Sequence, residues 1–159
     1  MSLVFNRNGD TLLSFVPGHQ PVVREHDSHV PLTWVVVVVQ HGGQYLLLHN
    51  HIRQQWEIPG GGIEAGEHPD DTARREVQEE TSQVVRELRC QGVFKVRLQS
   101  DGRHEYGVLY TGTIQELLPF IHNEESDRIC LWTPGETLDD DFSHLSHIMM
   151  DIAKNGKMA

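Results

Sequence analysis

The sequence predicts a layered α/β fold, in which helices cover the faces of one mixed β-sheet. Three segments indicate this class. Residues 33–39 form a continuous β-branched run, which is typical of a strand that is covered on both faces. Residues 69–82 predict a central helix, because Pro69 suits the first helical position and acidic residues follow it. Apolar residues at helical spacing within 142–154 predict a C-terminal helix that packs on the sheet.

Shorter apolar runs between turn residues predict the remaining elements. In chain order these are a hairpin of 3–5 and 12–15, a hairpin partner of the long strand at 45–48, a polar loop at 49–55, a strand end at 56–58, a glycine loop at 60–62, strands at 84–85, 93–98, 106–114 and 128–132, and a short helix or turn at 115–120. No linker-like stretch interrupts this order, so we expect a single domain over 1–159.

The composition excludes several classes of protein. A formal net charge of −10 disfavours extended nucleic-acid binding, which needs a basic surface, but a small anionic substrate is compatible with it. The N-terminus has no apolar signal core. The longest apolar run, 35–39, is far shorter than the roughly 20 residues that cross a membrane. With only two cysteines, we expect free thiols and a soluble, cytoplasmic protein without a membrane partner.

The central helix carries carboxylates where a phosphate site would be expected to carry a lysine. A glycine-rich P-loop supplies that lysine, whereas carboxylates repel phosphates. On a helical wheel, Glu76 and Glu80 border the buried stripe that Ala73 and Val77 define, and Glu79 lies farther round. Two carboxylates at a buried edge need a cation or a proton. The pattern predicts divalent cations between protein and substrate, with a salt-bridge network to the neighbouring arginines as the alternative.

Residues 61–83 resemble the Nudix box, G-x5-E-x7-R-E-U-x-E-E-x-G-U, in which U is an apolar residue. The first glycine and every charged position match, through Gly61, Glu67 and the run Arg75-Glu76-Val77-Gln78-Glu79-Glu80. The last glycine and the last apolar position are replaced by Ser82 and Gln83, at the end of the predicted helix. A match over so many spaced positions is a strong motif, and it identifies the chain as similar to the Nudix hydrolase superfamily.

The resemblance implies the Nudix-type α/β/α sandwich, with a mixed sheet, a central box helix and a C-terminal helix. It also implies hydrolysis of a nucleoside diphosphate linked to another group X, with Mg²⁺ as the cofactor or Mn²⁺ as its substitute. Positions that match the family's metal ligands are the Gly60 carbonyl, Glu76, Glu80 and Glu79, the last being a further ligand or a water-activating group. Arg75 matches the arginine that holds the acidic cluster, Glu67 matches its acidic partner, and Gly61 supports the box.

The sequence leaves the general base and the substrate contacts open. Many Nudix enzymes place the base on a loop before the last strand, and Glu125 is the residue that we favour there. Glu124, Glu105 and Glu79 are its competitors. Arg53 lies in a polar stretch and could face an anion, with simple solvation as the alternative.

The small domain resembles the MutT-type branch, which hydrolyses nucleoside triphosphates, including oxidised ones, to monophosphate and pyrophosphate. ADP-ribose, dinucleoside polyphosphates and nucleotide sugars are other substrates in the family. A Nudix-fold sensor that binds a nucleotide without cleaving it is a different class, but such domains usually lose box carboxylates. An isoprenoid diphosphate isomerase needs a cysteine and glutamate pair, for which Cys90 and Cys130 lack an obvious context. The family also suggests a homodimer.

Overall fold

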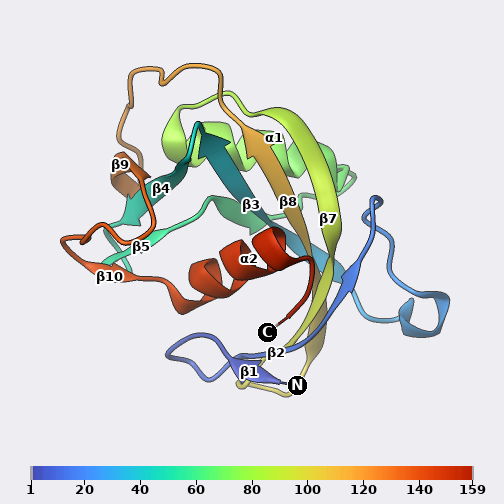
Figure 1. The fold of residues 1–159 in the computed structure, drawn as a ribbon. Coiled ribbons are helices and arrows are strands. Elements are labelled where there is room, and N and C mark those ends of the chain that lie inside the picture. Colours follow the sequence, from blue (N-terminus) through green and yellow to red (C-terminus); the bar gives the residue numbers. More distant parts are fainter. Residues whose placement is uncertain (1, 159) are drawn as a thin grey trace.

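In the computed structural model, which describes residues 2–158, a mixed sheet carries an α-helix on each side (Figure 1). The helices are α1 (Pro69–Thr81) and α2 (His144–Asn155), with a short 3-10 helix, η1 (Glu25–Asp27), before the central strand. The strands are β1 (Leu3–Val4), β2 (Thr11–Pro17), β3 (Leu32–His41), β4 (Gln44–Asn50), β5 (Gln55–Glu57), β6 (Gly60–Gly62), β7 (Arg86–Arg97), β8 (His104–Thr113), β9 (Ser126–Trp132) and β10 (Asp141–Phe142). The layers confirm the predicted α/β/α class.

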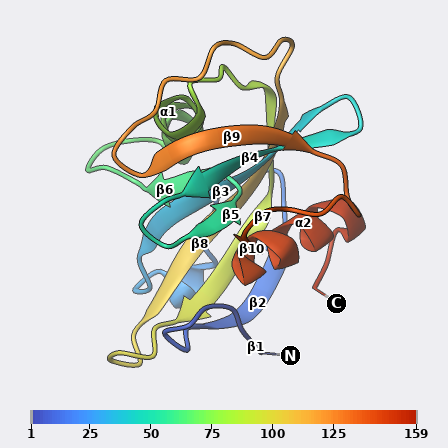
Figure 2. The ribbon, with the colours of Figure 1, turned by 90° about the vertical axis from the view of Figure 1, so that its left-hand side faces the viewer.

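Strand β3 divides the sheet into two parts. One edge of β3 pairs in parallel with β8. Its other edge is shared, because β6 pairs antiparallel with Trp34–Val36 and β4 pairs antiparallel with Gln40–His41. The sheet therefore has a large wing, made of β1, β2, β7, β8, β3 and β6, and a small wing, made of β4, β5, β9 and β10 (Figure 2). The parallel pair among antiparallel neighbours confirms a mixed sheet.

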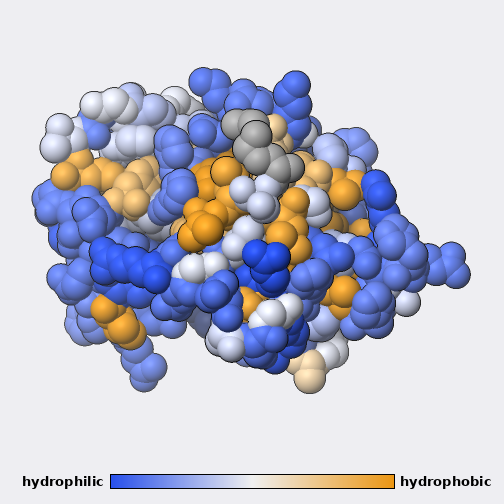
Figure 3. Space-filling view, turned by 90° about the horizontal axis from the view of Figure 1, so that it is seen from below, coloured by the Kyte–Doolittle hydropathy of each residue, from blue (hydrophilic) through white to orange (hydrophobic). Residues whose placement is uncertain are grey.

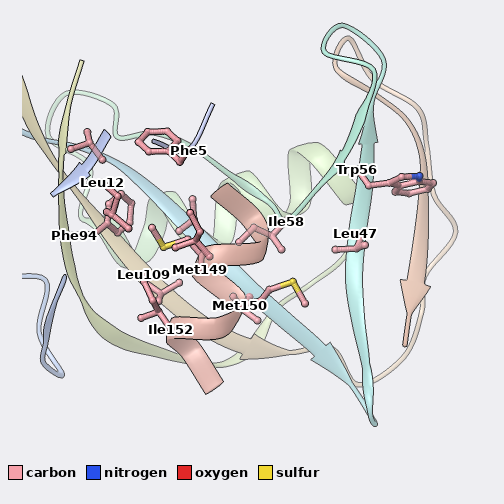
Figure 4. Close-up of a cluster of buried hydrophobic side chains, with 14 residues drawn as sticks. Phe5, Leu12, Leu47, Trp56, Ile58, Phe94, Leu109, Met149, Met150 and Ile152 are labelled. Atoms are coloured by element: carbon pink, nitrogen blue, oxygen red, sulfur yellow. The ribbon is translucent and has the colours of Figure 1, made fainter. Parts of the chain in front are cut away.

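The five consecutive valines of β3 are all buried, because both faces of this strand are covered. Odd-numbered valines pack toward α1, and even-numbered valines pack toward α2, each with at most 4% of its surface exposed. Figure 4 shows α2 within the curve of the sheet, with Met149 and Ile152 beside Leu109 of the large wing and Met150 on the side of Leu47. Both faces of β3 are thus covered, as predicted.

Helix α1 follows its prediction closely. It begins at Pro69, and the His68 ring caps it by accepting the N–H of Asp70 at 3.1 Å. It ends at Thr81, and Ser82 takes a left-handed backbone with φ of 63°. The predicted N-terminal hairpin is also present as β1 and β2. None of the helices in the described range is long and apolar enough to cross a membrane.

The face seen from below is partly apolar. Hydrophobic side chains gather at its middle, where the N-terminal hairpin and the end of α2 lie, and hydrophilic ones surround them (Figure 3). Leu3, Leu98 and Leu145 are partly buried residues that pack on the core beneath α2. This core therefore lies close to the surface at one end of the molecule.

Two expectations about the segment before α1 were wrong. Residues 60–62 form strand β6 rather than a loop, because glycine backbone can approach β3 closely. A Cβ atom on Gly60 would lie only 2.5 Å from the Val35 carbonyl oxygen. The expected polar loop at 49–55 is confined to 51–54, since His49 and Asn50 continue β4 and are buried.

Two further boundaries were also wrong. Residues 84–85 precede β7, because pairing between β7 and β8 begins only at Arg86. Of the two alternatives for residues 115–120, a short helix or a turn, the structure has a bend at 115–116, and the buried side chain of Gln83 supplies hydrogen bonds to the backbone of Leu118 there. Phe142 belongs to β10, which pairs with β5, so that α2 begins two residues later than expected.

Candidate active site

The carboxylates of α1 point in the directions that the helical wheel predicts. Glu80 is buried, with 6% of its surface exposed, Glu76 is half-buried and Glu79 is exposed. The backbone N–H of Gly60 donates to Glu80 Oε1 at 2.8 Å. The helix thus brings Glu76 and Glu80 against strand β6, where the Gly60 backbone lies beside the Glu80 carboxylate.

Burial destabilises the charged forms of these two acids. It raises the pKa of Glu76 and raises that of Glu80 well above its usual range. The negative charge of Glu125 acts in the same direction on both, so this side chain is near them. Within the described residues, Glu80 has no cationic partner in a salt bridge.

The donor set fits a hard divalent cation, because it combines carboxylates with a backbone position at Gly60. Across residues 2–158, no three acidic, histidine or cysteine side chains are already gathered around one point. Arg75 holds Glu76 at 2.9 Å and Glu79 at 3.2 Å in this arrangement. Arg75 contacts only Oε1 of Glu76 and Oε2 of Glu79, so the second oxygen of each carboxylate is not engaged by this guanidinium.

Arg75 joins the box helix to the segment before it. Its guanidinium donates to both Glu67 oxygens at 2.8 and 2.9 Å and to the Gly62 carbonyl at 2.9 Å. The hydrogen bonds from Arg75 to Glu67, with one from Thr72, lower the pKa of Glu67 to about 2. The arrangement brings together Arg75 and Glu67 as the sequence predicted.

Gly61 makes room for a box carboxylate. A Cβ atom at this position would lie 2.4 Å from both Cδ and Oε1 of Glu76. No heavy atom normally approaches so closely. The first glycine of the box is therefore needed for the position of Glu76, rather than for an unusual backbone angle.

A second buried acid, Glu57, was not recognised in the sequence. It accepts two hydrogen bonds from Arg53, at 2.8 and 3.0 Å, one from Asn50 at 3.2 Å and one from Gln55 at 2.6 Å. Arg53 remains 60% exposed, and the charges of Glu125 and Glu80 act on it. The contact with Glu57 raises the pKa of Arg53 and fixes its guanidinium. The signal in the sequence was an acid between the apolar Trp56 and Ile58.

Asn123 connects the loop of Glu125 to the end of α1. Its amide donates to the backbone carbonyls of Glu79 and Glu80, at 3.0 and 3.3 Å. Its side-chain oxygen accepts the N–H of Glu125 at 3.0 Å. Asn123 was also missed, because nothing local in the sequence marks it.

The competing bases lie in different surroundings. The backbone carbonyl of Glu124 accepts a hydrogen bond from the His51 ring at 2.5 Å. Glu79 is held by Arg75. Glu105 lies on β8, where Thr33 donates to it at 2.9 Å, and its charge is not among the main influences on the pKa of Glu76 or Glu80.

A groove of about 1170 Å³ opens beside these groups. It lies between the N-terminal hairpin, the floor of the large wing, the 52–58 segment and the start of α2. Gly60, Gly61, Glu80 and Arg53 line it together with Glu105. Its volume is sufficient for a nucleotide.

Residues 29–151 match the family model of the NUDIX domain. This match covers most of the 159 residues, and the chain therefore belongs to the Nudix family. Together with the curated relatives, it identifies a Nudix pyrophosphohydrolase. Members of this family act on small nucleotide substrates and generally use divalent metals such as Mg²⁺.

The relatives differ in substrate. An RNA pyrophosphohydrolase of Bartonella bacilliformis is 26% identical over 118 residues, which are 69% of each chain. An ADP-ribose pyrophosphatase of Mycobacterium tuberculosis is 32% identical over 129 residues, which are 75% of this chain and 59% of that protein. The crystal structure of a Bacillus subtilis pyrophosphohydrolase superposes with a TM-score of 0.74 at 22% identity, covering 98% of this chain and 96% of that one. This last likeness establishes the fold.

Proposed function

We propose that the protein hydrolyses a nucleoside triphosphate, including oxidised forms, to the monophosphate and pyrophosphate in an Mg²⁺-dependent reaction. The observation that carries this proposal is Glu80, a buried carboxylate with no cationic partner among residues 2–158, which borders a groove large enough for a nucleotide. Glu76, Glu79, Glu80 and the Gly60 carbonyl would hold the ion. When bound, Mg²⁺ neutralises charge on the diphosphate and makes its phosphorus more electrophilic.

The remaining chemistry is assigned to neighbouring side chains. Glu125 accepts a proton from the attacking water, because its charge acts on both Glu76 and Glu80 and its backbone is tied to α1 through Asn123. Arg53, fixed by Glu57, binds phosphate oxygens from the groove side. Arg75 and Glu67 keep the box carboxylates in position.

The first test is Glu80→Gln. Purified protein is incubated with Mg²⁺ and a panel of nucleoside triphosphates, oxidised dGTP, ADP-ribose, a dinucleoside polyphosphate, a nucleotide sugar and a 5′-triphosphorylated RNA. Phosphate and pyrophosphate release are measured. We expect triphosphate turnover that EDTA abolishes and that Glu80→Gln reduces about 100- to 1000-fold, because charge stabilisation at the phosphate is lost.

Glu116→Gln is the matched control, since Glu116 is an exposed acid outside the groove. It should retain the wild-type rate. Turnover of ADP-ribose or of a dinucleoside polyphosphate alone would replace the triphosphate assignment. Nucleotide binding without any turnover would instead indicate a sensor.

The second test compares two adjacent glutamates. Glu125→Gln should lower kcat about 100- to 10,000-fold with a small change in KM, as expected for removal of a general base. Glu124→Gln, which makes the same chemical change one residue earlier, should alter kcat less than about threefold. Equal losses in the two variants would contradict the assignment of the base.

A further inference from the structure

The groove continues beyond the carboxylates of α1 onto the floor of the large wing. This floor is formed by residues on the α2-facing side of three strands, with one residue just after the last of them: Trp34 and Val36 of β3, Glu105 of β8, Val96 of β7, and Leu98, which follows β7. β6 is adjacent to β3 on the other side, since Val36 is paired with Gly60. A substrate whose phosphates lie at Gly60 and Glu80 therefore extends its nucleoside across Trp34 toward Glu105.

Glu105 is a fixed carboxylate in this otherwise largely apolar floor. The β3–β8 register shifts between Leu32 and Trp34, and the intervening Thr33 donates its hydroxyl to Glu105 Oε2 at 2.9 Å. Arg103 approaches the other oxygen, Oε1, at 3.3 Å, and the Glu105 side chain keeps 18% of its surface exposed. Because a carboxylate has about four acceptor positions, one on each oxygen remains available to a ligand.

Trp34 supplies an aromatic surface beside this carboxylate. Its ring meets Phe94 edge-to-face, with centroids 4.9 Å apart and an interplanar angle of 87°. The residue opposite Trp34 on β8 is Gly107, where a Cβ would come within 2.3 Å of the Phe94 ring. The fully buried Phe94 ring therefore occupies the space over Gly107 and supports the indole of Trp34. The indole lines the groove, where it can stack with a planar base.

The Trp34 ring and the Glu105 carboxylate together favour one type of nucleobase. Guanine presents two adjacent donors, N1–H and the 2-amino group, which can pair with both oxygens of one carboxylate. Adenine presents an acceptor, N1, at the equivalent edge, which a carboxylate repels. We propose that Trp34 and Glu105 form a guanine subsite, in which the base stacks on the indole and donates two hydrogen bonds to Glu105. The proposal rests on the proposed function for the position of the phosphates.

The experiment compares GTP, ITP and ATP, with ITP lacking only the 2-amino group. We expect wild-type kcat/KM to be about 10- to 100-fold higher for GTP than for ATP, in keeping with one bidentate base contact, and ITP to lie between them. Glu105→Gln should remove at least tenfold of the GTP preference while ATP turnover changes less than about threefold. Asp141→Asn removes a charge from the same groove, where Asp141 pairs with Arg7, and should leave the GTP preference unchanged.

Binding of the monophosphates, measured by calorimetry, separates the two proposals. If no triphosphate is hydrolysed, the proposed function fails, but tighter binding of GMP than of AMP that disappears in Glu105→Gln still supports the subsite. Equal kcat/KM for GTP and ATP in the wild type, together with equal GMP and AMP binding, overturns the subsite. A Glu105→Gln variant that loses all three triphosphate activities equally also overturns it, since Glu105 would then act in catalysis or folding.

Discussion

At the scale of single residues, the site depends on one missing side chain. Gly61 and Glu76 come from different elements, yet the Glu76 carboxylate occupies the position of a Gly61 side chain. Gly61 has no left-handed φ, so an alanine is acceptable to the backbone itself. A side chain at position 61 would instead displace the Glu76 carboxylate.

Gly61→Ala should therefore displace Glu76 and lower kcat/KM about 10- to 100-fold, because shifts of about 1 Å at a catalytic group have effects of this size. Steady-state pyrophosphate release with Mg²⁺ measures the loss. Gly62→Ala is the matched control on the same strand, since its nearest neighbour would be 3.9 Å away. Comparable activity of the two variants would show that Glu76 does not need this space.

At the scale of elements, the end of α1 explains the two departures from the box. Ser82 takes the left-handed position, and its hydroxyl accepts the N–H of Ile121 at 3.0 Å. Gln83, fully buried, donates to the carbonyls of Thr81 and Leu118 and accepts the N–H of Leu118 at 2.7 Å. Both side chains attach the 114–125 segment to the helix that bears the carboxylates.

Gln83→Met should destabilise the protein by about 1–3 kcal/mol, because the backbone groups of Leu118 lose their partners in a buried place. Denaturant unfolding measures this change. Activity should fall as well, since the same segment carries Glu125. Gln78→Met, on the exposed side of α1, should change the unfolding free energy by less than about 0.5 kcal/mol. Wild-type stability in Gln83→Met would contradict the role of this contact.

At the scale of the whole molecule, a buried histidine holds the small wing together. His49 of β4 is 3% exposed and contacts Asp127 of β9 at 2.7 Å and Asp140, just before β10, at 2.9 Å. Burial is the largest influence on His49 and opposes its charge, but the two aspartates outweigh it and raise the pKa of His49 above its ordinary 6.5. Arg128 opposes the charge weakly.

The pKa values of Asp127 and Asp140 are lowered, whereas that of His49 is raised. The hydrogen bond from His49 is the main cause of the lowered pKa of Asp140, and at Asp127 the same residue outweighs burial. A raised histidine pKa contributes stability that is present below 6.5 and is lost as the pH rises through the folded value. The lowered aspartate pKa values contribute stability that is present above 3.8 and is lost on acidification.

His49→Gln should therefore lower Tm by roughly 5 °C near pH 5–6, and the difference from wild type should shrink as the pH rises above 6.5 and through the raised pKa of His49. Thermal scans from about pH 4 to pH 9 measure it. His147→Gln removes an exposed histidine that pairs with Asp151 on α2, and it should change Tm by less than about 1 °C throughout. A His49→Gln deficit that is the same at pH 5.5 and pH 9 would exclude a charged His49.

The sequence by itself determined the fold class, the bounds of α1 and the side of that helix on which Glu76 and Glu80 lie. These features depend on spacing within one segment, which periodicity reports directly. The resemblance to the Nudix box also implied the pairing of Arg75 with Glu67, which the structure contains. The predictions from the sequence were wrong where the structure of a segment depends on partners that are distant in the chain. Examples are the glycine strand β6 and the buried end of β4.

Only the tertiary structure decided what surrounds the carboxylates. Thr33 and Glu105 meet across 72 residues, and Asn123 reaches the Glu80 carbonyl across 43. β4 and β6 share one edge of β3, and pairing with Val36 on that edge holds the Gly60 backbone, which lines the groove. Contacts of this kind come from strand register and sheet curvature, which no local pattern of residues encodes. The groove residues that choose a substrate were therefore beyond the sequence, whereas the carboxylates that would hold the metal were within it.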